Sequence, residues 1–267
     1  MKILLVSDLH YALKQYDWTA QAARNFDLVV VAGDHIDIAG QLDGAVQVVV
    51  LLKYFRRLAE QTRLIVSSGN HDLDARNAAG EKTASWMQRV RQLGIAADGD
   101  SLMIGDTLIT VCPWWDGPVS KEAVAAQLAR DAATPKRAWH WVYHAPPTDS
   151  PTSWNGRRSF GDADLSAWIA TYRPNIVYSG HIHEAPFKVG GSWADKIGDT
   201  WVLNCGRQIG PTPTHIAIDT ERGEAVWLSL AGAERVQFSA PLERPFLALE
   251  TLPDWIASSP ARAPILA

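Results

Sequence analysis

Five short clusters of metal-ligand residue types are spread along this 267-residue sequence. Aspartate, asparagine and histidine offer oxygen and nitrogen donors that suit divalent metals of intermediate softness. The clusters are Asp8-Leu9-His10, Gly33-Asp34-His35-Ile36-Asp37, Gly69-Asn70-His71-Asp72, the single His144, and Gly180-His181-Ile182-His183. They contain six of the eight histidines, and this concentration indicates metal chemistry.

No single cluster establishes that chemistry. Asp-x-His and Gly-Asp also occur in turns and helix caps, Asn and Asp are common turn residues, and a single histidine can be a hydrogen-bonded core residue. His181 and His183 give a stronger signal, because residues two apart on an extended chain point the same way. The two remaining histidines, His140 and His215, fall inside strand-like runs without neighbouring ligand types, and we interpret both as structural.

Nearly every cluster follows a run of apolar residues that we expect to form a buried strand. These runs are 3–6, 28–31, 64–66, 139–143 and 176–178. Apolar residues at helical spacing between 45 and 55 predict a crossover helix between the second and third strands. This is the rhythm of β-α-β units, in which ligands bind at the carboxyl ends of the strands. The clusters are therefore expected to converge in space.

The second part of the chain is richer in strands. Gly105-Asp106 between the runs 102–104 and 108–111 predicts a hairpin, and a helix is expected over 121–132. Further strands are expected at 201–203, 216–218 and 225–228. A parallel half followed by a more antiparallel half predicts an α/β fold of two packed mixed sheets flanked by helices, a four-layer α-β-β-α sandwich in one domain. We assign residues 1–230 to this domain and expect the proline-rich segment 231–267 to pack on it or to be partly mobile.

Composition narrows the functional class. The formal net charge of -4 provides no overall positive field for nucleic acid, although bound cations would reverse the sign near a cluster of aspartates. Cys112 and Cys205 are far apart, which argues against a disulfide framework or a thiolate zinc site, and both are interpreted as buried. The longest apolar run, 48–52, is too short to span a membrane, and the N-terminus lacks a signal-peptide pattern. We expect a cytoplasmic protein.

The motifs along residues 8–183 resemble those of the calcineurin-like metallophosphoesterases. In order, they are Asp-x-His, Gly-Asp-x-x-Asp, Gly-Asn-His-Asp, a single His and Gly-His-x-His. The resemblance implies a two-sheet sandwich flanked by helices, in agreement with the strand pattern. It also implies two divalent or mixed-valence metal ions, for which Mn, Fe and Zn are candidates. The ligand sets implied for the two ions are Asp8, His10 and His183, and Asn70, His144 and His181, with Asp34 bridging both.

The same resemblance implies that hydroxide activated by the two metals attacks the phosphorus of a phosphate ester. His71 would protonate the leaving oxygen or stabilise its charge, and Asp37 would orient His71, a role that Asp72 can share. Protein serine/threonine phosphatases of this family have an arginine and a glutamate where this chain has Ile38 and Asp72. The difference points to phosphodiesters, nucleotides or small phosphomonoesters as substrates.

Three arginines are candidate substrate contacts. Arg207 follows a strand soon after Gly-His-x-His, and Arg157 and Arg158 lie in a loop that can bring a guanidinium over the site; an ordinary solvated pair is the alternative for the latter two. Trp114 and Trp115 can stack a nucleobase or form a pocket wall, with core or rim packing as the alternative.

We therefore predict a metal-dependent phosphoesterase of small substrates, with a phosphodiester such as a cyclic nucleotide favoured over a phosphomonoester. A nuclease using the same site is the second hypothesis, but it would need a basic groove, and the chain lacks an added nucleic-acid module. The third is a non-catalytic, metal-binding interaction scaffold. The complete ligand set and the presence of His71 argue for catalysis. The metals, the oligomeric state and the role of the tail cannot be derived from the sequence.

Overall fold

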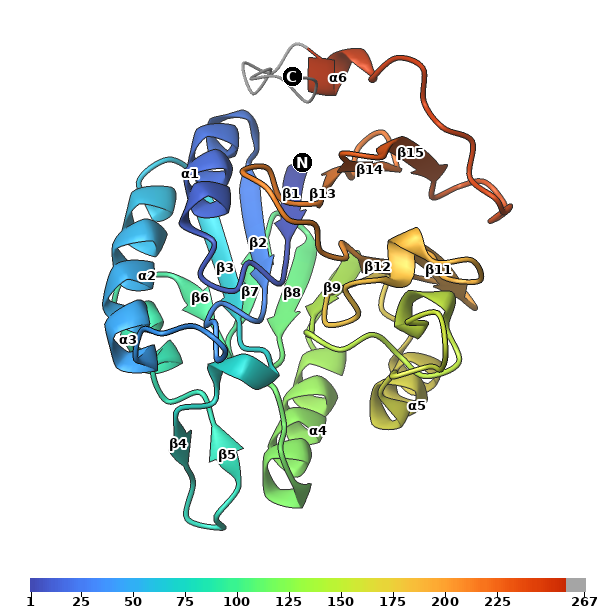
Figure 1. Cartoon of the computed structure of the whole chain (residues 1–267). Helices are drawn as coiled ribbons and strands as arrows, with labels where there is room; N and C mark the ends of the chain where they lie inside the picture. The colour runs from blue at the N-terminus through green and yellow to red at the C-terminus, as the bar shows by residue number, and fades with distance from the viewer. Residues whose placement is uncertain (258–267) are drawn as a thin grey trace.

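Two large β-sheets lie face to face in the computed structural model, which describes residues 1–257 (Figure 1). The first sheet has the strand order β15-β14-β13-β1-β2-β3-β6, and the second has the order β11-β12-β10-β9-β8-β7. The strands of the first sheet are β1 Lys2–Val6, β2 Leu28–Ala32, β3 Arg63–Ser67, β6 Ala96–Ala97, β13 His215–Asp219, β14 Glu224–Ser229 and β15 Gly232–Gln237. Those of the second are β7 Ser101–Ile104, β8 Thr107–Val111, β9 Ala138–Val142, β10 Ile176–Ser179, β11 Ala194–Ile197 and β12 Thr200–Asn204. A separate hairpin consists of β4 Ala75–Arg76 and β5 Lys82–Thr83.

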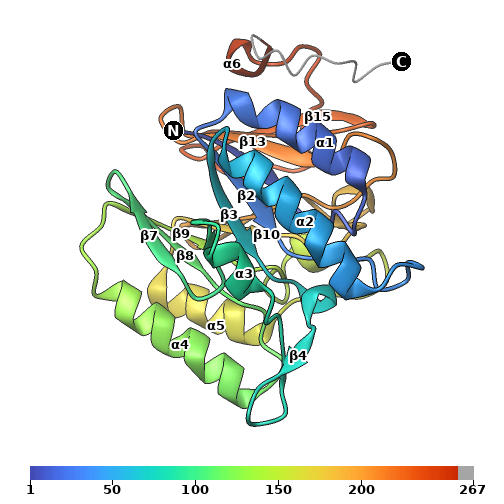
Figure 2. The ribbon, with the colours of Figure 1, turned by 90° about the vertical axis from the view of Figure 1, so that its left-hand side faces the viewer.

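Helices cover the outer face of each sheet, so that the single domain has four layers (Figures 1 and 2). On the first sheet these are α1 Leu13–Ala22, α2 Gly44–Ala59 and α3 Met87–Arg91. On the second they are α4 Pro118–Ala132 and α5 Ala163–Tyr172. This arrangement confirms the predicted α/β sandwich. None of the helices within residues 1–257 has the length and apolar character needed to cross a bilayer.

The alternation of side chains along β1 shows how the sequence produces these layers. Ile3 and Leu5 pack into the core between the two sheets, whereas Leu4 and Val6 pack beneath the helices of the first sheet. Because successive side chains of a strand point to opposite faces, a fully apolar strand can serve two cores at once. The same division holds in β2, where Val30 faces the inter-sheet core and Val29 faces α2.

The parallel half expected first is formed by β1, β2, β3 and β6, and the more antiparallel half expected after it also contains parallel pairs. The strands β8, β9, β10 and β12 lie in the second half and pair in parallel with their neighbours in that order. Helices α4 and α5 provide the crossovers that parallel pairing requires, and the sequence pattern identified only the first of them. The antiparallel strands β13, β14 and β15 instead extend the first sheet from β1.

The described part of the segment after residue 230 adds a strand to the first sheet and then packs against it. β15 pairs with β14 in antiparallel register, and the short helix α6 Asp254–Ala257 places Trp255 in a small cluster against β13 and β14. The indole Nε1 of Trp255 donates a hydrogen bond to Glu224. Residues 258–267 of the predicted tail lie outside the described residues, and the domain boundary at 230 stays a prediction.

Candidate metal centre

All five ligand clusters lie at one edge of the sandwich, where parallel strands of both sheets end. Asp8, Asp34 and Asn70 follow the carboxyl ends of β1, β2 and β3 in the first sheet. His144 and His181 follow β9 and β10 in the second. The two sheets face each other, and the loops of both therefore meet at this edge.

One group of ligand atoms comes from Asp8, His10, Asp34 and His183, which lie within 4.8 Å of one another. The Nε2 atoms of His10 and His183 are 3.1 Å apart, and the Nε2 of His183 is 3.2 Å from Oδ1 of Asp8. Two imidazole nitrogens and two carboxylates thus point at a common space. Mixed nitrogen and oxygen donors of this kind suit divalent metals of intermediate softness.

A second group consists of Asp34, His144 and His181, and it also fits within 4.8 Å. The Nε2 of His144 is 3.3 Å from Oδ2 of Asp34, and the rings of His144 and His181 have centroids 5.2 Å apart. Asp34 belongs to both groups. A carboxylate shared in this way has the position required to bridge two ions.

Unpaired polar atoms provide an independent test of whether these residues fit a metal. Oδ1 of Asn70 and Nε2 of His144 are both buried without a hydrogen-bond partner among the described residues. Buried donors and acceptors are nearly always paired in native proteins, so each such atom requires an explanation. A cation adjacent to these atoms would provide one, and the site therefore fits the group that its residue types suggest.

The backbone of the site lies in a conformation that most residues avoid. Asp8, His10, Asp34 and His181 have φ values of 56°, 38°, 54° and 67°. Residues other than glycine rarely adopt this left-handed region, which costs on the order of 1–3 kcal/mol each. Such backbone geometry is concentrated at functional sites because it directs side chains to places that regular structure cannot reach.

The motif glycines allow the backbone to approach the ligands closely. A Cβ atom on Gly69 would lie 2.2 Å from Oδ1 of Asp34, and one on Gly180 would lie 2.3 Å from Oδ2 of Asp8. On Gly33 it would lie 2.4 Å from Nδ1 of His144. A side chain at any of these three motif glycines would thus collide with a candidate ligand.

Charge is distributed unevenly among the histidines. Burial alone would lower the pKa of His144, but Asp34 and then Asp8 outweigh it and raise this pKa to about 10. Burial lowers the pKa of His10 and of His181 to about 4. Burial raises the pKa of Asp8, yet His144 and His183 together bring it down to about 2. The two carboxylates thus favour a positive charge between them, and a metal cation would supply it while leaving the imidazoles neutral, as ligation requires.

His71 lies beside the first group, and its expected partner does not reach it. The Nε2 of His71 is 3.9 Å from Oδ2 of Asp34, and its ring has its centroid 4.7 Å from that of His10. Its Nδ1 is buried without a hydrogen-bond partner. The Asp37 carboxylate instead accepts a hydrogen bond from the backbone N–H of Ala39 and closes its own turn. Within residues 1–257 no hydrogen bond or ion pair joins Asp37 to His71, and the orienting role of Asp37 stays a prediction.

The side chain of Asp72 joins the loops that carry two of the candidate ligands. Its fully buried carboxylate accepts hydrogen bonds from the backbone N–H groups of His35, Ile36 and Gly69. These bonds join the loop after β2 to the loop after β3. His35 completes the support, with Nε2 2.8 Å from the carbonyl oxygen of Ser67. Both side chains therefore hold the loops that carry Asp34 and Asn70, and neither contacts His71 through a hydrogen bond.

Of the three candidate arginines, Arg207 contacts a ligand residue, and the other two make no such contact within the described part of the chain. Nε of Arg207 donates a 3.1 Å hydrogen bond to the carbonyl oxygen of Asp8, which places the guanidinium beside the first ligand group. Arg157 and Arg158 are exposed, and the Arg158 guanidinium lies over the ring of Phe160. No interaction of the described residues connects these two arginines to the ligand groups.

Sequence reasoning missed two supporting residues. Ser7 donates a 2.5 Å hydrogen bond to Oδ2 of Asp8. Nδ2 of the buried Asn204 donates to the carbonyl oxygens of Thr152 and Ile182, while its Oδ1 accepts from Gly206. Asn204 is the last residue of β12, and the ligand clusters likewise lie at the ends of their strands. Its place at a strand end was the feature from which the sequence could have identified it.

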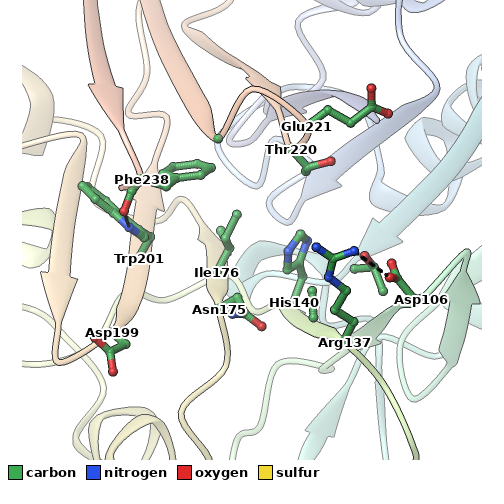
Figure 3. A pocket seen from close by; sticks show the side chains of 13 residues that line it. Asp106, Arg137, His140, Asn175, Ile176, Asp199, Trp201, Thr220, Glu221 and Phe238 are labelled. Carbon is green, nitrogen blue, oxygen red and sulfur yellow. Dashed lines mark hydrogen bonds and ion pairs between the residues drawn. The ribbon is translucent and has the colours of Figure 1, made fainter. Parts of the chain in front are cut away.

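The opposite edge of the sandwich carries a cavity of about 660 Å³ (Figure 3). Its lining includes Asp106, Arg137, His140 and Phe238, and none of the candidate metal ligands. Nδ1 of His140 is hydrogen-bonded to the hydroxyl of Tyr178, and Arg137 pairs with Asp106. The cavity lies at the amino ends of the strands and is separate from the metal centre. The structural interpretation of His140 and His215 agrees with their burial.

The calcineurin-like phosphoesterase family model matches residues 1–185, and the chain belongs to this family. Its fold is similar to that of TT1561 of Thermus thermophilus, with 15% identity, a TM-score of 0.57, and coverage of 89% of this chain and 98% of that one. It is also similar to the purple acid phosphatase PPD1 from seeds of yellow lupin (Lupinus luteus), with 13% identity and a TM-score of 0.55. That alignment covers 90% of this chain and 52% of the lupin protein. At these identities the likeness shows the fold alone. The comparison with curated proteins finds no relative.

Proposed function

We propose that this protein is a binuclear metal-dependent phosphoesterase that hydrolyses small phosphodiesters. The observation that carries the proposal is the sharing of Asp34 by two groups of ligand atoms. One ion would be held by Asp8, His10 and His183, and the other by Asn70, His144 and His181, with Asp34 between them. Two ions bound there supply activated water and neutralise the charge of the phosphoryl oxygens. Manganese, iron and zinc all suit these donors.

The side chains around the ligands support proton transfer and substrate binding. We assign proton donation to the leaving oxygen to His71, whose side chain is 26% exposed and whose Nε2 lies near Asp34. The guanidinium of Arg207 is held at its Nε by Asp8, and its terminal nitrogens make no hydrogen bond within residues 1–257. These nitrogens are available to a phosphoryl oxygen.

The small number of arginines at the ligand groups supports a diester substrate over a monoester. A diester has one negative charge and a monoester approaches two near neutral pH. Of the three arginines considered, only Arg207 contacts a ligand residue, whereas Arg157 and Arg158 interact with their own loop. Among the described residues the site thus adds one guanidinium to the two metal ions, and the second negative charge of a monoester would find no further arginine there.

Hydrolysis of bis(p-nitrophenyl) phosphate and of p-nitrophenyl phosphate after reconstitution with manganese tests the proposal. We expect faster cleavage of the diester, and loss of cleavage of both substrates in His71→Ala and Asn70→Ala. His140→Gln, at the opposite edge, is the control variant and should cleave as the wild type does. A metal-loaded wild type that cleaves neither substrate would contradict the proposal and favour an interaction scaffold. Faster cleavage of the monoester would retain the site and reject the diester assignment.

A further inference from the structure

Trp114 forms a wall beside the second ligand group. It lies in the loop between β8 and α4, and its ring centroid is 5.3 Å from that of His181 and 5.9 Å from that of His144. The side chain is only partly buried. The indole therefore offers apolar surface at the place where a phosphoester bound at the metals would extend.

The position of this ring is set by its surroundings before any ligand binds. The backbone N–H of Trp114 donates to Oγ of Ser68, which follows β3, and its ring lies at 21° to the ring of Tyr143. A ring already held in place binds a partner without a further cost of ordering. Trp115 is different, because it stacks on Tyr143 at 3.9 Å and also contacts Trp168. The ring contacts of Trp115 are thus with other packing residues, whereas the partly buried Trp114 also contacts two histidines of the second ligand group.

The two ends of a diester would meet different surroundings at this site. His71 contacts His10, and Arg207 contacts Asp8, both on the side of the first ligand group. Trp114 contacts histidines of the second group only. If His71 protonates the leaving oxygen, the leaving group departs on the first side. The ester substituent that remains on phosphorus then lies on the side of Trp114.

We infer that the substrate is a phosphodiester whose retained substituent carries a planar aromatic ring, such as a nucleoside, and that this ring packs on Trp114. The inference rests on the proposed function and adds a substrate class to it. Indole binds planar rings through their faces and has no preference for one pattern of hydrogen bonds. Trp114 therefore selects for a flat substituent without selecting a particular base.

Two diesters with the same leaving group test this assignment. Thymidine 5′-(p-nitrophenyl phosphate) has a planar base in its retained substituent, and methyl p-nitrophenyl phosphate has none. We expect wild type to show the lower KM for the thymidine diester. Trp114→Ala should raise that KM by about tenfold, at the lower end of what loss of a base-stacking ring costs, and should leave the methyl diester unchanged. Trp114→Phe should restore most of the difference, and Trp115→Phe should behave as wild type.

Manganese affinity by calorimetry and the melting temperature, measured on each variant, separate substrate contact from damage to the site. Equal losses on both diesters, with weaker manganese binding, would mean that Trp114 only positions His181 and would overturn the inference. Unchanged kinetics in Trp114→Ala would overturn it as well. Wild type that cleaves the methyl diester as efficiently as the thymidine diester contradicts the inference alone. Wild type that cleaves neither diester contradicts the proposed function, and the inference falls with it.

Discussion

The two edges of the sandwich contain similar residue types in different states. At the carboxyl edge, Asn70 and His144 have buried polar atoms without hydrogen-bond partners among the described residues, and the backbone is left-handed at several ligand positions. At the amino edge, His140 is hydrogen-bonded to Tyr178, and Glu221 binds the N-terminal amine. Histidines and carboxylates near a cavity therefore do not by themselves indicate a metal site. What distinguishes the carboxyl edge is the presence of buried polar atoms without hydrogen-bond partners within residues 1–257, together with left-handed backbone at the ligand positions.

The largest effect on activity is expected at Asp34, the residue shared by both ligand groups. Asp34→Asn keeps the size of the side chain and removes its charge. We expect turnover to fall by more than the ~100-fold that loss of an outer-shell partner costs. Metal content should also fall, as measured by elemental analysis after dialysis. Retention of two ions per chain in this variant would contradict the shared position that we assign to Asp34.

A glycine substitution tests whether close approach at the carboxyl edge is required. Gly180→Ala would place a Cβ 2.3 Å from Oδ2 of Asp8, and we expect metal affinity to fall by about 10–100-fold, as for loss of an outer-shell contact. Gly44→Ala is the matched control, because its Cβ would meet no atom closer than 3.9 Å, in Ile36. Calorimetric titration with manganese measures both variants. Equal affinities would show that the loop yields easily and would weaken the comparison.

Arg207 is expected to affect substrate binding more than turnover. Arg207→Ala removes a charged hydrogen-bond donor worth about 1.5–3 kcal/mol, so KM for a diester should rise by about tenfold or more. Arg207→Lys should recover part of this loss. Arg157→Ala should leave KM unchanged, because its side chain is exposed and makes no contact with the ligand groups. An increase in KM at Arg157 instead would revive the hypothesis that its loop lies over the substrate.

Two buried histidines outside the ligand groups should affect stability in acid and leave activity unchanged. Burial lowers the pKa of His140 and of His215 to about 4, from an ordinary value of 6.5. As pH falls from about 6.5 towards 4, the unfolded chain binds protons that the folded chain does not, so stability falls across this window. Each residue contributes about 3 kcal/mol. In the metal-free protein His10 and His181, whose pKa values burial also lowers to about 4, add to this decline. His140→Gln should therefore remove only the part that belongs to His140, measured by urea unfolding in the presence of a chelator. An unaltered pH profile would mean that His140 titrates normally.

The sequence predicted much of the site because the chemistry constrains residue types strongly. Asp8, His10 and His144 were identified by type and by their places after strands, and the structure brings each of them close to Asp34. Asp37 shows the limit of this approach, because its motif position predicted a contact that its turn does not make. Asn204 shows the opposite limit. Its type is common in turns, and only its hydrogen bonds to two loops reveal what it supports.

By itself, the sequence determined the residue types at the metal centre, the two-sheet architecture and the strand ends that carry the candidate ligands. These follow from local patterns of apolar alternation, loop residues and motif order. Only the tertiary structure decided that Arg207 and Trp114 flank different ligand groups, and that Arg157 and Arg158 do not contact these groups among the described residues. The reason is physical: these relations join loops far apart in the chain, and the packing of the two sheets, rather than any local preference, sets the distances between them.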